Sequence, residues 1–573
     1  MKRLLALVLT IAMALTMTAF ASAEQTAKFT AGTYSSVQYG HNGNVTVEVT
    51  FSEDGITDIQ MTNHHETDRI SDAAIEAIRE TVVGLQTLEV DVVSGSTVTY
   101  AAIIRGVYDC VAQAGGKTAD FAKNTTPKQE DTTIDASVVI VGAGGAGLSA
   151  AVEAAQQGLT NIVVLEKLAS VGGSTGHSSG ALLCPTDDSD PSFDKEVFYD
   201  MQLTVGGTDD FLARGIADIG GDTIEWLRGM NVTLNEYRAT SGNYEVRYVS
   251  PNTDKGFVRP NGMKIINGLY DTAVATGVID IQLNTTATSI IMKDGAAAGV
   301  VAQRKDGSIV TVNADAVILA TGGFDNGDIA LRFDPKANMM NHVSGSGNTG
   351  DGIKMAVEVG AKEYYAETMV RMGGNSNWLN LLGLSNNFIC VNGLGQRILA
   401  EGCHYSEETA ALNASASPYV YRVFDSTNDA AVMEDLVAKG KMRKFATIEE
   451  MCSGLSIDLE GLKATIERYN SMTGKTDEDF GKDASLMLGF GEGPYYTIQV
   501  KTEILNTFGG LCVNANCEVL DTNGNAIANL YGAGETANGN YFVKGYAYSG
   551  AAIQWAISSG RIAARSIAAK LAQ

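Results

Sequence analysis

The chain has 573 residues, of which 66 are acidic and 41 basic, and its formal net charge is −25. This length implies several domains, and the strong negative charge argues against nucleic acid or an anionic membrane surface as a partner. The seven cysteines form no C-x-x-C pair and no C-x-x-C-H site, so zinc, iron–sulfur and c-type haem centres are not expected. Cysteines scattered in this way usually serve as small buried apolar side chains. A Cys512–Cys517 disulfide is the alternative.

The first 23 residues have the features of an export signal. A basic pair at residues 2–3 precedes the apolar run Leu4–Phe20, and residues 21–23 form a small-residue cleavage site. No later apolar run is long enough to span a bilayer. We therefore expect a secreted, extracytoplasmic mature protein.

Residues 24–123 are predicted to form a small α+β domain. Thr30 to Met61 alternates apolar and polar residues around glycine-containing turns, which indicates strands. Two amphipathic segments, Ser71–Val82 and Thr99–Ala114, predict helices. The polar residues 124–135 follow and are predicted to be a linker.

The segment Ser94-Gly-Ser-Thr-Val-Thr99 stands where the second of these helices should begin. A phosphate on the Thr99 hydroxyl would lie at a helix N-terminus, where backbone N–H groups and the helix dipole favour an anion. An ordinary helix cap is the alternative. The segment resembles the flavinylation site of FMN-binding domains, and residues 63–67 (Asn-His-His-Glu-Thr) resemble the His-x-Glu-Thr element of that family. The resemblance implies FMN bound covalently to Thr99 and a flavin transferase that attaches it.

A dinucleotide-binding pattern begins at Ser137. A buried strand, residues 137–141, leads into Gly142-Ala-Gly-Gly-Ala-Gly147 and a helix through Gln157; a second strand, residues 162–165, ends at Glu166. Gly142 makes the tight turn, Gly144 lets the backbone approach a pyrophosphate, and Gly147 lets the helix pack on the strand. Glu166 stands where an acidic side chain binds ribose hydroxyls. The pattern predicts a dinucleotide cofactor.

Later segments favour FAD over NAD. They are residues 171–175 (Val-Gly-Gly-Ser-Thr), residues 318–324, which close three strands predicted from Ile279, residues 530–535 (Leu-Tyr-Gly-Ala-Gly-Glu) and the predicted last helix, Ala551–Leu571. Together, from about residue 135 to the end, they resemble the superfamily of fumarate reductase, flavocytochrome c and 3-ketosteroid dehydrogenase. The resemblance implies an α/β fold: a glutathione-reductase-type, Rossmann-like FAD-binding domain (136–360 and 500–573) with an α+β cap (361–499).

The same resemblance implies which residues hold non-covalent FAD. Glu535 is expected near the flavin ribityl chain, and the last helix is expected to direct its N-terminus at the ring system, where its dipole would stabilise reduced flavin. The expected FAD-binding residues are Gly142, Gly144, Gly147, Glu166, Gly173, Ser174, Thr175, Thr321, Gly322, Gly323, Gly534, Glu535 and Ile553.

Three positions depart from the fumarate reductase pattern. The proton-donating arginine of those enzymes is replaced by Tyr405, their substrate histidine is missing from residues 504–510, and Ala547 stands at the position of their carboxylate-binding arginine. A buried carboxylate without its arginine would be left unpaired, at a cost of several kcal/mol. We therefore do not expect fumarate as the substrate.

The same positions are more similar to 3-ketosteroid dehydrogenases. That resemblance implies that the Tyr546 hydroxyl and the Gly550 N–H polarise a substrate ketone and that Tyr405 handles the proton. Run as a reduction, hydride would reach the β-carbon of an activated alkene and Tyr405 would protonate the α-carbon. Arg371 is the remaining anchor if the substrate carries a carboxylate, and His342 lies near the cofactor or at the surface.

These features predict an exported two-flavin reductase of a small unsaturated carbonyl compound. FMN on Thr99 would receive electrons from a membrane or extracytosolic donor and pass them to FAD. The alternatives are a urocanate- or cinnamate-type acrylate reductase anchored by Arg371, a 3-ketosteroid-type dehydrogenase, and a non-enzymatic flavin electron carrier.

Overall fold

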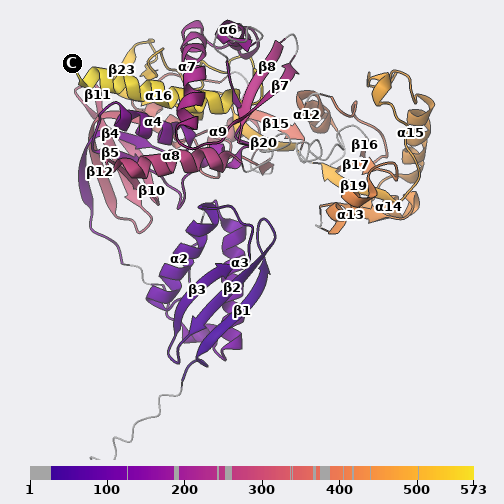
Figure 1. Cartoon of the computed structure of the whole chain (residues 1–573), viewed down its shortest axis with the longest axis horizontal. Helices are drawn as coiled ribbons and strands as arrows, with labels where there is room; N and C mark the ends of the chain where they lie inside the picture. The colour runs from indigo at the N-terminus through magenta and orange to yellow at the C-terminus, as the bar shows by residue number, and fades with distance from the viewer. Residues whose placement is uncertain are drawn as a thin grey trace, which may run out of the picture. The chain divides into compact units, whose positions relative to one another are not determined.

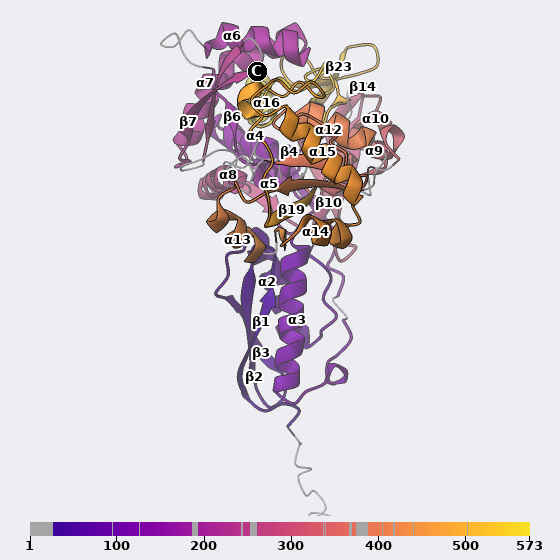
Figure 2. The same ribbon diagram turned by 90° about the vertical axis from the view of Figure 1, so that its right-hand side faces the viewer.

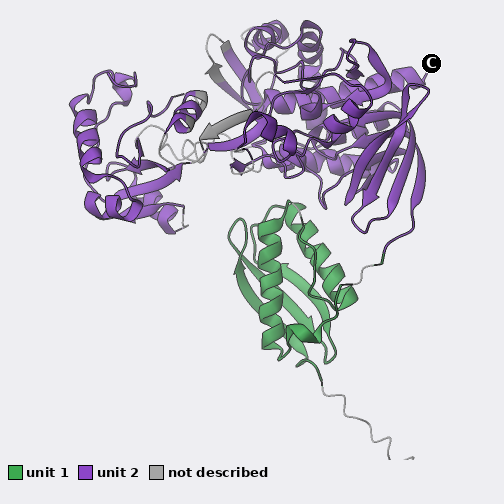
Figure 3. Cartoon of the chain, turned by 180° about the vertical axis from the view of Figure 1, so that it is seen from behind, with its two compact units in different colours: residues 1–127 green, residues 128–573 purple. Residues whose placement is uncertain are grey.

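The chain forms two compact units in a computed structural model, residues 1–127 and residues 128–573 (Figure 3). The structure describes residues 27–93, 95–124, 127–185, 193–241, 244–251, 261–335, 337, 340–365, 369–373, 388–403, 405–415, 419–438, 441–500 and 502–573. The boundary between the units falls inside the predicted linker. The predicted export signal lies outside the described residues.

The first unit is a three-stranded antiparallel sheet covered by two helices (Figure 2). Helix α3 packs across β1 and β2, and α2 packs against β3. Alternate residues of β2 are fully buried, which is the pattern of a strand with one face on a core. Gly106 of α3 lies so close to β2 that a Cβ would come within 2.6 Å of Val47. The elements are β1 (Gly32–Tyr39), β2 (Asn44–Phe51), β3 (Ile56–Thr62), α2 (Ile70–Leu85) and α3 (Thr97–Gln113).

Helix α3 begins two residues earlier than the sequence predicts, at Thr97, with Ser96 as its N-cap residue. Thr99 therefore lies in the first turn rather than at the first position. The backbone N–H groups of a first turn have no partner within the helix, so the expectation of an anion-favouring environment at Thr99 still holds.

The second unit is organised around one large sheet with the strand order β10-β11-β12-β4-β5-β9, to which β23 and β22 are added beside β12. The strands β9, β5, β4, β12 and β23 are parallel, whereas β10 and β11 run antiparallel to their neighbours. The strands are β4 (Thr132–Val141), β5 (Ile162–Leu165), β9 (Ile279–Gln282), β10 (Thr285–Lys293), β11 (Ala296–Arg304), β12 (Ile309–Leu319), β22 (Glu518–Leu520) and β23 (Ala526–Gly532).

Two predicted boundaries in this sheet need correction. Strand β4 begins at Thr132 rather than Ser137, because its first residues pair with Val310 and Thr311 of β12, so the end of the predicted linker belongs to the sheet. The segment from Ile279 to Ile318 holds four strands rather than three. Asn284, with φ of +52°, makes a turn that separates β9 from β10, and β9 then pairs with β5.

The last helix, α16 (Ala551–Leu571), packs along α4 (Gly145–Gln156), as Figure 1 shows. Gly560 lies so close to α4 that a Cβ would come within 2.3 Å of the Ala146 carbonyl oxygen. Arg561 of α16 makes a buried ion pair with Glu153 of α4 at 2.7 Å. The C-terminal helix is therefore fixed against the dinucleotide-binding helix along its length.

The predicted cap has its own antiparallel sheet, in the order β16-β17-β19-β18. Residues 363–364 and 369–373, which the sequence assigns to the cap, instead pair with strands after residue 501. The cap's own sheet therefore begins later than residue 361, at Ile389. Its elements are β16 (Ile389–Asn392), α12 (Tyr405–Ala414), β17 (Val420–Phe424), α13 (Ala430–Ala438), β18 (Arg443–Phe445), α14 (Ile448–Leu455), α15 (Leu459–Ser471) and β19 (Tyr495–Val500).

Smaller elements complete the second unit. The helices are α5 (Gly173–His177), α6 (Lys195–Met201), α7 (Asp210–Arg228), α8 (Gly262–Thr276), α9 (Asp328–Phe333) and α10 (Asp351–Glu358). The strands are β6 (Leu182–Leu183), β7 (Asn235–Ser241), β8 (Tyr244–Ser250), β13 (Asn341–His342), β14 (Glu363–Tyr364), β15 (Met369–Gly373), β20 (Thr502–Thr507) and β21 (Gly510–Leu511). Across the part of the chain that the structure describes, no helix has the length and apolar character needed to cross a bilayer.

Candidate active site

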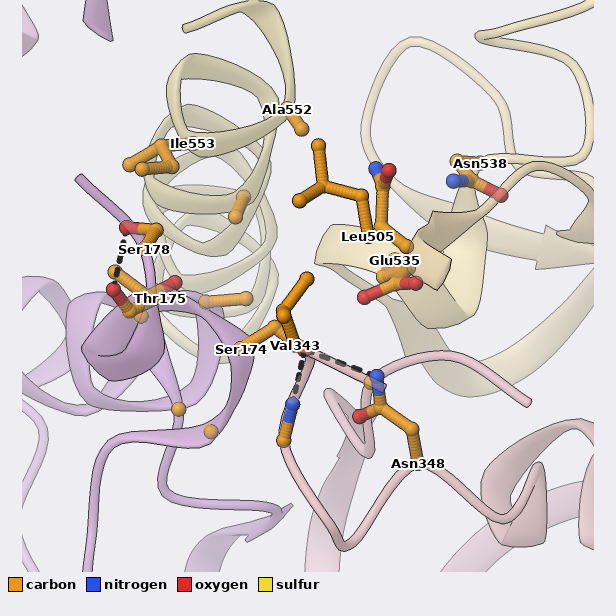
Figure 4. A pocket seen from close by; sticks show the side chains of 18 of the residues that line it. Ser174, Thr175, Ser178, Val343, Asn348, Leu505, Glu535, Asn538, Ala552 and Ile553 are labelled. Carbon is orange, nitrogen blue, oxygen red and sulfur yellow. Dashed lines mark hydrogen bonds between the residues drawn. The ribbon is translucent and has the colours of Figure 1, made fainter. Parts of the chain in front are cut away.

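A cavity of about 740 Å³ lies in the second unit, at the carboxyl ends of β4, β5 and β12. Ligands of open parallel sheets bind at this edge. Figure 4 shows Ser174 and Thr175 on one side of the cavity, Glu535 and Asn538 on another, and Ala552 and Ile553 of α16. The predicted site residues that line it are Gly142, Gly144, Glu166, Gly173, Ser174, Thr175, Thr321, Gly322, Glu535, Tyr546, Gly550 and Ile553.

The glycine-rich loop leaves room for a ligand at one of its glycines. A Cβ on Gly144 would have no neighbour nearer than 3.8 Å, whereas one on Gly142, whose φ is +106°, would lie 2.3 Å from the Ala320 carbonyl oxygen. Helix α4 begins at Gly145, and its first residues line the cavity. The loop therefore fits a dinucleotide, because a pyrophosphate could approach the Gly144 backbone and the N–H groups that begin α4.

Three of the predicted FAD-binding glycines do not line the cavity but allow close packing beneath it. A Cβ on Gly147 would lie 1.8 Å from the Gly142 carbonyl oxygen. On Gly323 it would lie 2.2 Å from Glu535 Oε1, and on Gly534 it would lie 2.8 Å from the Ala146 side chain. These glycines hold the cofactor-binding segments together rather than touching the space itself.

Glu166 lies at the end of β5, where the sequence predicts a ribose-binding acid. Its carboxylate accepts hydrogen bonds from the Ala143 N–H at 2.8 Å and the Leu168 N–H at 2.9 Å. Burial raises the pKa of this carboxyl group, and the backbone donors oppose that rise. The side chain is thus fixed beside the glycine-rich loop, with lone pairs left to accept from sugar hydroxyls.

A buried polar network lies beside the cavity, and the sequence-based prediction named only one of its members, His342. At its centre is Asp325, which accepts from Asn348 Nδ2 at 3.0 Å and contacts His342 Nδ1 at 2.8 Å. The other ring nitrogen of His342 faces the Ala337 carbonyl oxygen at 3.0 Å. Both ring nitrogens thus face acceptors, and the Asp325 carboxylate raises the pKa of His342.

This network reaches the cofactor cavity through Asn348, whose Nδ2 also donates to Ser174 Oγ at 2.9 Å (Figure 4). The sequence shows Asp325 and Asn348 only as isolated polar residues, so no periodicity or motif identified them. The prediction that His342 lies near the cofactor or at the surface is resolved: it is partly buried and joined to a residue of the cavity wall through Asp325 and Asn348.

Glu535 projects into the cavity opposite Ser174 (Figure 4). Its Oε1 accepts from the Thr507 N–H at 2.7 Å and from the Thr507 hydroxyl at 2.8 Å. Burial, together with the negative charge of Asp325, raises the pKa of Glu535 to about 7. The group can therefore hold or release a proton near neutral pH.

Tyr546 and Gly550 lie together at the N-terminus of α16, but not in the predicted arrangement. The Gly550 N–H donates to Tyr546 Oη at 3.1 Å, and the Ala552 N–H does so at 3.4 Å. The expectation that the Gly550 N–H itself faces the substrate needs correction, because this N–H already donates a hydrogen bond to the Tyr546 oxygen. A phenol that accepts from two N–H groups at a helix N-terminus becomes a better donor through its own proton.

Aromatic side chains surround Tyr546. Its ring centroid lies 5.8 Å from that of Phe508 and 5.6 Å from that of Phe542, and the two phenylalanines are 4.8 Å apart. Ala547, buried beside them, also lines the cavity. This part of the wall suits a flat apolar compound better than a carboxylate.

The cap contributes a second part of the cavity wall, which the sequence did not indicate. Phe388, Glu408 and Arg422 line the cavity, and Arg422 of β17 makes an ion pair with Glu408 of α12. The Arg422 guanidinium also lies 5.1 Å from the Phe388 ring centroid. No motif marks these residues, because strand pairing and helix packing within the cap bring them to the cavity.

Two predicted catalytic side chains fall outside the described part of the chain. Tyr405 is the first residue of α12, and Arg371 lies in β15 in register with Ile504 of β20, but neither side chain is described.

In the first unit, the two motifs of the predicted FMN site meet. Thr99, which is 4% exposed, donates from its hydroxyl to Glu66 Oε2. Glu66 also accepts from the Asn42 N–H at 2.7 Å and the His41 N–H at 3.2 Å. Ser96, the N-cap residue of α3, has a buried hydroxyl without a hydrogen-bond partner among the described residues.

The cysteines are all free thiols, so the alternative Cys512–Cys517 disulfide is not formed. Six of the seven are buried, and Cys403 is partly buried. Burial raises the pKa of the Cys512 thiol to about 11 and that of the Cys517 thiol to about 12. These thiols behave as small apolar side chains.

Comparison with known proteins supports both cofactor-binding domains. The sequence model of the FAD binding domain family matches residues 137–551, and that of the FMN-binding domain family matches residues 40–112. A urocanate reductase of Eggerthella lenta is 32% identical over 532 residues, which are 87% of this chain and 86% of that protein.

Two solved structures share the fold. The open conformation of a flavocytochrome c3 fumarate reductase matches with a TM-score of 0.66 and 26% identity, over 76% of this chain and 78% of the other. A 3-ketosteroid-Δ4-(5α)-dehydrogenase from Rhodococcus jostii matches with a TM-score of 0.60 and 22% identity, over 77% and 98%. The chain therefore belongs to the FAD binding domain family, together with fumarate reductase-like enzymes, and is a FAD-dependent oxidoreductase that carries an FMN-binding domain before its FAD-binding domain.

Proposed function

We propose that this protein is an exported two-flavin reductase of a C=C bond conjugated to a carbonyl group. The observation that carries the proposal is that one cavity is lined by the dinucleotide-binding loop, the Tyr546–Gly550 turn and the cap residues Phe388 and Arg422. A cofactor and a small substrate could meet in that space, which a pure electron carrier does not need.

The chain's own residues would bind and activate the substrate. FAD, when bound, would supply the hydride chemistry. The Tyr546 hydroxyl, polarised by two N–H groups of the α16 turn, would donate to the substrate carbonyl and stabilise the enolate that develops. Tyr405 is the proposed proton donor to the α-carbon; it stands one turn before Glu408, a cavity residue on the same helix. Cap closure would exclude water.

Electrons would enter through the first unit. In this proposal FMN is attached to Thr99 by a flavin transferase and accepts electrons from a membrane or extracytosolic donor. The contact of Thr99 with Glu66, at the start of α3, supports a site built around that hydroxyl. Residues 1–23 would direct export.

The substrate is either an enone or an acrylate. Ala547 and the aromatic wall favour an enone without a carboxylate. The urocanate reductase of Eggerthella lenta favours an acrylate, and Arg371 is the proposed anchor for its carboxylate. A steroid-type dehydrogenase working in the opposite direction is the less favoured alternative, because a chain that only removes hydride from its substrate needs no flavin that feeds electrons in.

Anaerobic reoxidation of the reduced, FAD-loaded protein tests the proposal. The flavin absorbance should return when an enone or an aryl acrylate is added, and the panel member that acts fastest identifies the substrate class. If no alkene reoxidised the flavin, the result would contradict the reductase and favour the non-enzymatic electron carrier. Bleaching of the oxidised protein by a saturated ketone would instead indicate a dehydrogenase.

A further inference from the structure

The Thr99 hydroxyl has a built-in proton acceptor. The hydroxyl donates a hydrogen bond to Oε2 of Glu66, a residue 33 positions earlier in the sequence. Both side chains are buried, with exposed fractions of 4% for Thr99 and 6% for Glu66. A general base must lie within hydrogen-bond reach of the proton that it removes, and Glu66 meets this condition before any partner binds.

Glu66 also has a structural task in the turn between β1 and β2. It accepts the Asn42 and His41 N–H groups, and Gly40 lies so close that a Cβ would come within 2.8 Å of Oε1. Those donors need only an acceptor oxygen, which a glutamine would also provide. The contact with Thr99 is different, because only a carboxylate can take the proton.

We propose that Glu66 is the general base for the attachment of FMN to Thr99. This inference rests on the proposed function, in which Thr99 carries FMN. In the step, Thr99 Oγ attacks the flavin-side phosphorus of a flavin adenine dinucleotide held by a flavin transferase. The Oγ–P bond forms, the P–O bond to the AMP half breaks, and AMP leaves with that electron pair. The hydroxyl proton passes to Glu66, and nothing is oxidised or reduced.

The product fits the surroundings of the two side chains. The new phosphodiester carries a negative charge beside Glu66, and the proton taken from Thr99 would keep that carboxyl group neutral. The first turn of α3 has N–H groups without intrahelical partners, which favour the new anion. Because both side chains are buried, the residues around them must shift before the dinucleotide can reach Thr99.

The test measures FMN attachment to the full chain by intact mass, with a flavin transferase and FAD, while the acceptor concentration is varied. Glu66→Gln should lower kcat by about 10²-fold or more, the usual contribution of a general base, and leave KM within about twofold. Asn42→Ala removes the side-chain bonds of the turn to His65 and Thr67 but keeps the Glu66 carboxylate, and its kcat should stay near the wild-type value. Glu80→Gln, an exposed acid of α2, is the matched charge control.

The outcomes are distinguishable. Unchanged kcat in a folded Glu66→Gln protein, a change in KM alone, or an equal loss of kcat in Asn42→Ala would overturn the assignment of Glu66 as the base. Circular dichroism of each variant establishes that it folds. A wild-type chain that gains no FMN would instead contradict the proposed function, and the role of Glu66 would fall with it.

Discussion

Thr99 donates a hydrogen bond to Glu66, so the two FMN-binding motifs of the first unit form one buried site. Neither motif is conclusive by itself, because a threonine at the start of a helix is more often a simple cap and a glutamate in a loop is usually solvated. Their contact also explains why the polar pair tolerates burial: Glu66 receives three donors, and Thr99 provides one of them.

Attachment of FMN should depend on Thr99 alone in this segment. Thr99→Ala should abolish the mass gain of one FMN in a host with a flavin transferase, whereas Thr99→Ser should keep it because the hydroxyl remains. Thr97→Ala, an exposed threonine in the same turn of α3, is the matched control and should be modified like the wild type. Intact mass spectrometry measures FMN attachment in all three variants. Loss of FMN from Thr97→Ala, or its retention in Thr99→Ala, would place the attachment elsewhere.

Turnover should depend on the Tyr546 hydroxyl. Tyr546→Phe keeps the ring among Phe508 and Phe542 but removes the donor, so kcat with the identified alkene should fall by about 10²–10³-fold, as for other lost oxyanion donors. Tyr541→Phe is the control, because its buried hydroxyl has no hydrogen-bond partner among the described residues. Its kcat should be unchanged and its stability raised by about 1 kcal/mol. Similar kcat values for both variants would remove Tyr546 from the mechanism.

Gly147 should be required for the FAD-binding domain to fold tightly. A Cβ there would lie 1.8 Å from the Gly142 carbonyl oxygen, so Gly147→Ala should destabilise the second unit by about 3 kcal/mol and weaken FAD binding. Gly215→Ala in α7 is the matched control: a Cβ there would meet nothing within 4 Å, and the change should be neutral or stabilising by about 0.5–1 kcal/mol. Thermal unfolding and flavin titration measure both. Equal melting temperatures for the two variants would contradict the close packing.

The pH dependence of stability should carry a contribution from Glu535. Its pKa of about 7 in the folded protein lies above the ordinary value of 4.5, so between these pH values the native state holds a proton that the unfolded chain has lost. The free energy of unfolding therefore falls as pH rises through this range, and the slope from one such group is at most about 1.4 kcal/mol per pH unit.

In the protein without bound flavin, Glu535→Gln should flatten this fall in the free energy of unfolding. Below about pH 4 the slopes of the variant and the wild type should become equal. Denaturant unfolding at a series of pH values measures it. Asp521→Asn is a comparison at a partly exposed acid outside the cavity. The Asn525 N–H lowers the pKa of this carboxyl group, so the substitution should not change the slope in this range. Parallel curves for the wild type and Glu535→Gln would show that the group titrates normally.

Some parts of this protein could be predicted because they depend only on the spacing of residues along the chain. The turn at Gly142, the helix after Gly144 and the acid at Glu166 follow one another within a single βαβ unit, so their order in the chain fixes their positions in space. The polar linker predicted the two-domain organisation, whereas the cavity-lining segments at residues 173–175 and 321–322 were expected from the resemblance to the fumarate reductase and 3-ketosteroid dehydrogenase superfamily.

The contacts between distant segments could not be predicted in this way. Asp325 and His342 are joined to Ser174 through Asn348, and Arg422 reaches the same cavity from the cap, yet no periodicity connects these residues. The direction of the Gly550 N–H toward Tyr546 depends on how the turn before α16 folds. Side-chain contacts of this kind follow from packing and hydrogen-bond satisfaction across the whole unit, which a linear pattern does not encode.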